Sequence, residues 1–157
     1  MTNALTQTWD MSHEANAFLL AGLKPAWLAD RYAARTRSVA AQFAHMHNVR
    51  LAWLKHMAPE SLGKLAAFER GAQPTKAQLK SALNASAKAL AELFEAHADA
   101  DELKPWKGPP ATFLGYLVAH EAHHRGLVMV ALRAAERKPP ETLVYGQWDW
   151  GKPGSAR

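Results

Sequence analysis

Four segments of this chain repeat apolar residues at the three- and four-residue spacing of an α-helix, and almost nothing alternates as a β-strand does. Helices with one apolar face bury that face by packing against other helices. Hydrophobic residues make up 48% of the 157 residues, enough to fill one compact core. The sequence therefore predicts an all-α fold, a four-helix bundle in a single domain over residues 1–157 with an ordered core at about 10–140.

Capping residues and prolines mark the expected ends of these helices. The four helices are predicted at about residues 10–23, 36–57, 75–97 and 111–137. Asp10 or Ser12 is the expected cap of the first helix, and Thr36 is the expected cap of the second. Thr75 opens the third helix in a capping box with Gln78. From residue 141 onward we expect a short irregular C-terminal tail, in which residues 142–145 (TLVY) are a weak strand candidate.

Composition excludes several classes of function. The chain has no cysteine, which removes disulfides, thiolate metal ligands and cysteine nucleophiles. The first ten residues lack the features of a signal peptide, and no apolar stretch has the roughly 18 to 20 residues that a membrane span needs. The net charge of +5 comes from scattered Lys and Arg residues without a recognition motif. We therefore expect a cytoplasmic protein with no nucleic-acid or membrane partner.

Two histidines interrupt the apolar face of the fourth predicted helix. Phe113, Leu117, His120, His124 and Ala131 all lie within roughly 60° of one another on the helical wheel. A buried imidazole without a hydrogen-bond partner costs on the order of 1–3 kcal/mol, so two stacked in a core need a common partner. Imidazoles at positions i and i+4 can both reach one metal ion at about 2.0–2.1 Å. We favour a divalent metal ion over two hydrogen-bonded core histidines.

A third ligand is expected from another helix, because catalytic metal sites commonly use three protein ligands and keep one position open. The second predicted helix offers His45, His47 and His56. His45 and His47 flank the apolar position of Met46 on opposite sides. Periodicity leaves the choice between these two histidines open.

The histidine segment of the fourth predicted helix also matches a second motif. Residues 120–124 read HEAHH, which satisfies the HExxH signature of zinc peptidases, where the glutamate is the general base. The longer form of that signature needs glycine three residues after the second histidine, and Gly126 is only two residues after His124. Glu121 and His123 both lie off the histidine face, so we assign no catalytic acid or base. A zinc peptidase is the less favoured alternative.

Residues 44–54 (AHMHNVRLAWL) and 120–126 (HEAHHRG) resemble the DinB/YfiT-like superfamily of metal-binding four-helix bundles. The family pattern has a ligand histidine followed by an apolar residue, with an aromatic residue eight positions after the histidine. His45, Met46 and Trp53 match this pattern, and His47 does not. In the fourth helix the family pair ends just before Arg-Gly, which corresponds to His120 and His124. The resemblance implies that the metal ligands are His45, His120 and His124.

The resemblance also implies an up-down-down-up bundle, a zinc or nickel ion at the bottom of a cleft, and a homodimer. Members of the superfamily include thiol-dependent S-transferases and a thiol-dependent isomerase. We expect a metal-dependent enzyme of the S-transferase or hydrolase type. Its substrate would be a small molecule, such as a low-molecular-weight thiol. The alternative is a metal-stabilised dimeric bundle without turnover.

Overall fold

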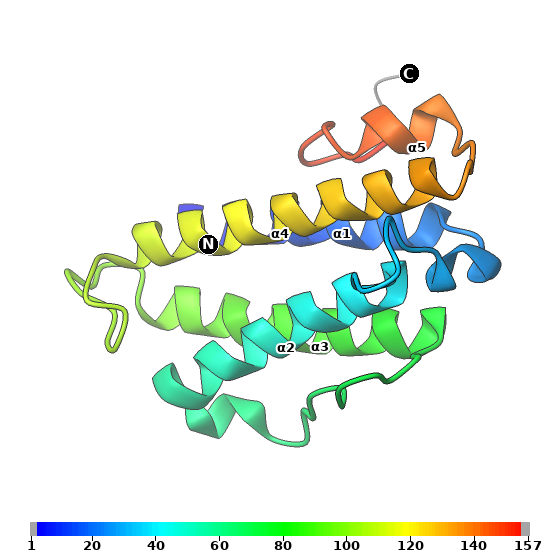
Figure 1. Cartoon of the computed structure of the whole chain (residues 1–157). Helices are drawn as coiled ribbons and strands as arrows, with labels where there is room; N and C mark the ends of the chain where they lie inside the picture. Colours follow the sequence, from blue (N-terminus) through cyan, green and yellow to red (C-terminus); the bar gives the residue numbers. More distant parts are fainter. Residues whose placement is uncertain (1–2, 155–157) are drawn as a thin grey trace.

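The computed structural model describes residues 3–154, and its regular elements are helices. Four long helices form the bundle: α1 (Ala4–Gly22), α2 (Val39–Met57), α3 (Lys76–Ala96) and α4 (Pro110–Ala134) (Figure 1). Three short elements accompany them: the 3-10 helices η1 (Pro25–Ala29) and η2 (Pro59–Leu62), and the helix α5 (Glu141–Gly146). Residues 3–154 contain no β-strand, so the predicted all-α class is confirmed.

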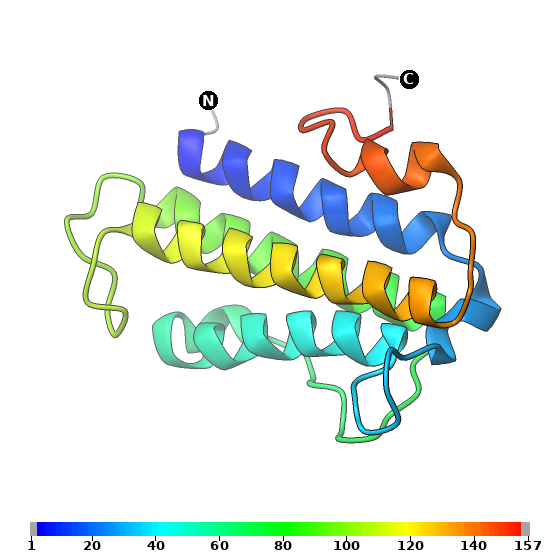
Figure 2. The ribbon, with the colours of Figure 1, turned by 45° about the horizontal axis from the view of Figure 1, so that its top comes forward.

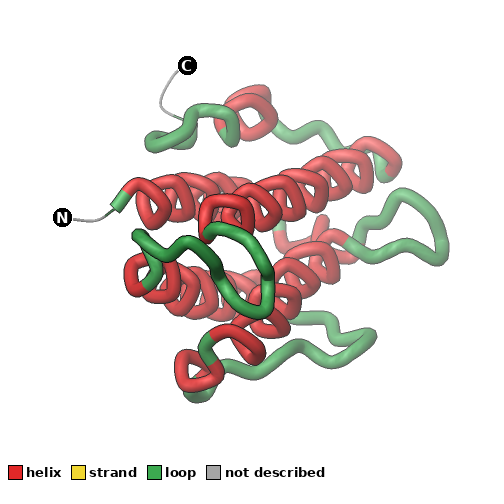
Figure 3. The backbone as a smooth tube through the Cα atoms, turned by 90° about the vertical axis from the view of Figure 1, so that its left-hand side faces the viewer, coloured by secondary structure: helices red, strands yellow, loops and turns green. Residues whose placement is uncertain are grey.

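The long helices have the up-down-down-up arrangement. In Figures 1 and 2, α1 and α4 run in one direction, and α2 and α3 run in the other. α1 packs against α3 and α4, and α2 packs against the same two helices. Because α2 and α3 point the same way, residues 58–75 return along the bundle to reach the start of α3. Figure 3 views the bundle from the end at which α1 begins, where the loop between α3 and α4 also lies.

The first two helices begin at other residues than predicted. α1 starts at Ala4, well before Asp10, because the Asn3 side chain accepts hydrogen bonds from the backbone N–H groups of Leu5 and Thr6 at 2.9 and 3.0 Å. α2 starts at Val39, capped by Ser38. The predicted cap Thr36 instead donates a 2.8 Å hydrogen bond to the carbonyl of Ala33 in the preceding loop. The predicted caps of both helices are therefore wrong.

The other two helices agree better with the prediction. Thr75 and Gln78 form the predicted capping box, with each side chain accepting from the other residue's backbone N–H. α4 begins one residue earlier than expected, at Pro110, and ends at Ala134, three residues before Arg137. Glu136 has a φ of 55°, a left-handed conformation that cannot continue a right-handed helix.

The C-terminal segment is more ordered than predicted. Residues 142–145 lie in α5, so the strand candidate is wrong. Leu143 is buried, and it contacts the end of α1 at Gly22, where even a Cβ atom would overlap its side chain. Leu143 and Gly146, three residues apart, are the buried residues of α5, which is the spacing of one helical turn. A strand at this position would have needed a partner strand. In Figure 1, α5 lies outside the four long helices, beyond α4 and α1.

Buried residues of the bundle form two apolar clusters with polar side chains between them. One cluster includes Leu19, Phe43 and Val128, and the other includes Trp9, Leu54 and Phe113. Between them lie fully buried polar residues from all four long helices, and we call four that are joined by hydrogen bonds the polar layer: Asn16, Arg50, Ser86 and Glu121. Within residues 3–154, no helix combines the length and the apolar character that a membrane crossing requires.

Candidate metal centre

Three histidines from two antiparallel helices meet at one side of the bundle. His45 lies on α2, and His120 and His124 lie one turn apart on α4. One ring nitrogen from each of the three lies within 4.8 Å of the others. The Nε2 atoms of His120 and His124 are 3.1 Å apart. Two ligands of a tetrahedral zinc ion, each at about 2.0–2.1 Å from the metal, lie roughly 3.3 Å apart. The cluster could therefore hold a metal ion.

A neighbouring side chain fixes the proton on His124. The Nδ1 atom of His124 lies 2.7 Å from the Oε1 atom of Gln42, which is buried on α2. An amide oxygen can only accept, so Nδ1 carries the proton and donates it to Gln42. The lone pair of His124 is then on Nε2, which points toward His120. Metal-ligating histidines commonly donate their second N–H in this way.

The three imidazoles are poorly satisfied by the protein alone. The Nδ1 atom of His120 is buried, and it has no hydrogen-bond partner among the described residues. His45 has ring contacts with His120 and His124, with centroid distances of 5.3 and 4.7 Å, and no hydrogen bond within residues 3–154. A shared cation would bind the Nε2 atoms of His120 and His124 and one ring nitrogen of His45, for which side chains provide no other partner, so the residues present fit a metal ion.

The electrostatic environment keeps these imidazoles neutral, as metal binding requires. Burial, followed by the charges of Arg37 and His120, lowers the pKa of His45 to about 4. Burial and the neighbouring His120 and His45 lower the pKa of His124 to about 3. Burial is also the main reason why the pKa of His120 is lowered. All three are therefore unprotonated at neutral pH, with lone pairs free for a cation.

Comparison with known families agrees with this geometry. The model of the DinB family matches residues 1–153. This chain belongs to the DinB family. A comparison with curated proteins finds no match. Family membership confirms the resemblance that the two histidine segments indicated, over nearly the whole chain.

The structure shows which of His45 and His47 on α2 lies beside the histidine pair of α4. His47 lies on the other side of α2 from His45, where its Nδ1 is 3.1 Å from Ser86 Oγ and its Nε2 is 3.0 Å from the Ala66 carbonyl oxygen. Both of its nitrogens are thus used in contacts within the protein. His56 is exposed near the end of α2. In this DinB-family bundle, only His45 of the three joins the pair on α4.

Glu121 has a role that sequence reasoning missed. Its carboxylate accepts two hydrogen bonds from Arg50, from Nε at 2.6 Å and from Nη2 at 2.9 Å. Asn16 Nδ2 donates a third, at 2.6 Å. Both members of this ion pair are fully buried. The sequence signal was the placement of Arg50 seven residues after Phe43 and four after Met46, on the apolar face of α2.

An aromatic cluster borders the histidines on one side. Tyr116 stacks on His120, with ring centroids 5.9 Å apart and an angle of 25° between the rings. Trp53 and Trp106 contact Tyr116 edge-on or tilted, at 5.7 and 5.1 Å. Trp53 is the aromatic residue that the family pattern places eight positions after His45. These rings give the centre an aromatic border on this side.

On the other side, a basic cleft opens beside His45. It has a volume of about 780 Å³ and is formed by the loop before α2, by α2 itself and by residues 68–73. Four arginines and one glutamate provide the charged groups of its lining: Arg31, Arg35, Arg37, Arg70 and Glu69. The positive charge of Arg37 contributes to the lowered pKa of all three clustered histidines. The cleft thus places the histidines beside a positively charged surface.

Proposed function

We propose that His45, His120 and His124 hold one divalent metal ion, zinc or nickel, and that the chain is a metal-dependent enzyme. The observation that carries this proposal is the convergence of three ring nitrogens within 4.8 Å, all on histidines whose pKa is lowered. Three neutral protein ligands leave a tetrahedral ion one position for water or substrate. Such an ion lowers the pKa of a coordinated water or thiol toward neutrality.

The residues of the chain supply orientation and solvent control. Gln42 holds the His124 ring in one tautomer through the 2.7 Å hydrogen bond to Nδ1. Tyr116, stacked on His120, orients the second ring. His45 lines the cleft directly, so a molecule entering the cleft reaches the histidine cluster at this residue.

The cleft supports a small-molecule substrate that carries negative charge. Four arginines against one glutamate attract anions and raise their local concentration. A low-molecular-weight thiol with carboxylate groups has these properties, and its sulfur is a ligand that zinc and nickel accept. We therefore favour a thiol S-transferase, with a hydrolase acting on an anionic ester or amide as the second type.

Two alternatives remain distinct from this proposal. A metal-stabilised dimeric bundle without turnover would have a fourth protein side chain on the metal. Within residues 3–154 the cluster of potential ligands contains three histidines only, which favours the enzyme over this alternative. A zinc peptidase of the HExxH type needs Glu121 free to act on water at the metal. The 2.6 Å ion pair of Glu121 with Arg50, buried in the bundle, argues against that role.

Cobalt(II) substitution tests whether a coordination position is open. We expect the cobalt-loaded protein to develop a near-ultraviolet charge-transfer band when mercaptosuccinate is added, because a thiolate then joins the three imidazoles. His123→Ala should behave like the unaltered protein, since His123 is exposed and lies outside the cluster. An unchanged spectrum at saturating thiol would mean that the site is closed and would favour the non-catalytic bundle.

A further inference from the structure

A chain of buried polar side chains leads from the polar layer to the outer side of α4. Arg125 donates a 2.7 Å hydrogen bond from Nη1 to Asn16 Oδ1. Asn16 in turn donates from Nδ2 to Glu121 Oε2 at 2.6 Å, and the same carboxylate pairs with Arg50. This series of hydrogen bonds thus joins Arg125 to Arg50 through Asn16 and Glu121.

The charges of these hydrogen-bonded side chains do not balance. Arg50 and Glu121 are each 0% exposed and neutralise each other, whereas Arg125 is 6% exposed and forms no ion pair within residues 3–154. Burying a charge is costly unless a counter-charge and hydrogen bonds accompany it. Burial lowers the pKa of Arg125, although its guanidinium stays protonated at neutral pH. One buried positive charge is therefore left without a carboxylate.

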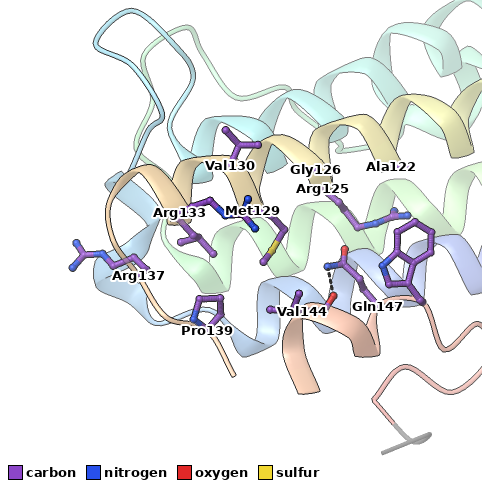
Figure 4. Close-up of a pocket in the computed structure, with 12 residues that line it drawn as sticks. Ala122, Arg125, Gly126, Met129, Val130, Arg133, Arg137, Pro139, Val144 and Gln147 are labelled. Carbon is purple, nitrogen blue, oxygen red and sulfur yellow. Dashed lines mark hydrogen bonds between the residues drawn. The ribbon is translucent and has the colours of Figure 1, made fainter. Parts of the chain in front are cut away.

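Arg125 borders a cavity of about 430 Å³ between α4 and the C-terminal segment. Figure 4 shows Arg125, Met129 and Arg133 on the α4 side of this cavity, and Val144 and Gln147 on the α5 side. Among the described residues, its lining contains three arginines, Arg125, Arg133 and Arg137, and no acidic residue. Arg137 is already paired with Asp30 at 2.8 Å, so the excess positive charge belongs to the other two. The volume is in the range that small organic ligands occupy.

This cavity is separate from the histidine cluster. At about 100° per residue, Ala122 and Met129 lie roughly 160° to 180° around α4 from His120. The cavity therefore lies on the side of α4 that faces the C-terminal segment, whereas His120 and His124 face α2. A ligand in one site makes no contact with the other.

We propose that this cavity binds a small organic anion, a carboxylate that carries an apolar chain or ring. The carboxylate pairs with Arg125, and Arg133 adds a second positive charge at the same wall. The apolar part lies between Met129 on α4 and Val144 on α5. Such a ligand neutralises the buried charge of Arg125, which no carboxylate pairs with inside residues 3–154, and it buries apolar surface at the same time.

Titration calorimetry with octanoate tests this assignment on the full-length chain. We expect one octanoate per chain, bound at least tenfold more tightly than 1-octanol or acetate, which lack the charge or the apolar chain. Arg125→Gln should weaken octanoate binding at least tenfold, and Arg125→Lys should restore part of it. Octanoate that fails to bind, or that binds no better than 1-octanol, overturns the proposal.

A second variant keeps the test valid if Arg125→Gln folds poorly. Gly126 lines the cavity, and a Cβ atom added to it meets nothing within 4 Å, so Gly126→Leu fills the cavity without a clash at the backbone. Gly115→Leu is the matched control, because Gly115 is also in α4, has the same open space and lies outside the cavity. We expect Gly126→Leu alone to abolish octanoate binding. Equal binding by both variants overturns the proposal, as does a wild-type dimer that Gly126→Leu converts to monomer, since a second copy would then cover this face.

Discussion

The amide oxygen of Gln42 accepts a 2.7 Å hydrogen bond from Nδ1 of His124, and this bond leaves the lone pair on Nε2, which lies 3.1 Å from Nε2 of His120. Gln42 is one turn before Met46 on α2, and it is 1% exposed. In the proposed metal centre Gln42 would therefore position His124 without being a ligand itself. The bond connects α2 and α4 at the point where the two helices present their histidines.

Removing this hydrogen bond should weaken metal binding. We expect Gln42→Met to lower zinc affinity roughly 10- to 100-fold, as is usual when the hydrogen-bond partner of a ligand histidine is lost. Gln42→Glu should preserve the affinity, because a carboxylate accepts from Nδ1 equally well. Competition with a chromophoric chelator measures both. Unchanged affinity in Gln42→Met would show that Gln42 does not position His124.

The ion pair between Arg50 and Glu121 should be needed for stability. Glu121→Leu leaves the buried Arg50 guanidinium unpaired, which should cost about 3–5 kcal/mol of unfolding free energy. Arg50→Met combined with Glu121→Leu should recover much of this loss, because neither charge then remains. Urea unfolding of the two single variants and the double variant gives the coupling energy.

A catalytic role for Glu121 predicts a different result. If Glu121 were the general base of a peptidase, Glu121→Leu would remove activity with little effect on unfolding. A loss of stability below about 1 kcal/mol would contradict the structural role and reopen the peptidase alternative.

The helices and the histidine pair could be predicted because each depends on local spacing. Thr75 and Gln78 lie three residues apart, and His120 and His124 lie four apart, so their relationships follow from the helix alone. The choice of His45 over His47 needed the family resemblance, since both lie on α2 and only tertiary contacts separate them. His47 is held by Ser86 and Ala66, which are 39 and 19 residues away in the chain.

Other features depend on contacts between distant segments. Glu121 is paired with Arg50, 71 residues away, and a helical wheel of α4 alone showed only that it lies off the histidine face. The start of α1 was missed because its cap, Asn3, precedes the strongly apolar part of the helix. The segment at 142–145 was ambiguous because short apolar runs suit either a strand or a helix. Its packing against Gly22 decides for the helix.

Protonation of His13 should make the protein less stable in acid. Burial is the main reason why the pKa of His13 is lowered to about 4, and Arg50 adds to the effect. The unfolded chain, with a pKa near 6.5, takes up the proton first as pH falls. Stability contributed by the neutral imidazole is therefore complete above pH 6.5 and is lost between about pH 6.5 and 4.

His13→Leu removes this titration and also a buried nitrogen without a hydrogen-bond partner within residues 3–154. Between pH 6.5 and 4 we expect the variant to lose less unfolding free energy than the unaltered protein, by on the order of 2 kcal/mol. Urea unfolding across this range, with the metal removed from both proteins, makes the comparison. A nuclear magnetic resonance titration that gives His13 a pKa near 6.5 would contradict this account.

Metal content measured by elemental analysis tests the shared cation most directly. The untagged protein, purified without added chelator, should contain about one zinc or nickel ion per chain. The double variant His120→Ala, His124→Ala should contain none while keeping its helical circular dichroism, and His123→Ala should retain the full amount. A double variant that still binds one ion per chain, or an unaltered protein that binds none even after incubation with zinc and nickel, would contradict the three-histidine centre.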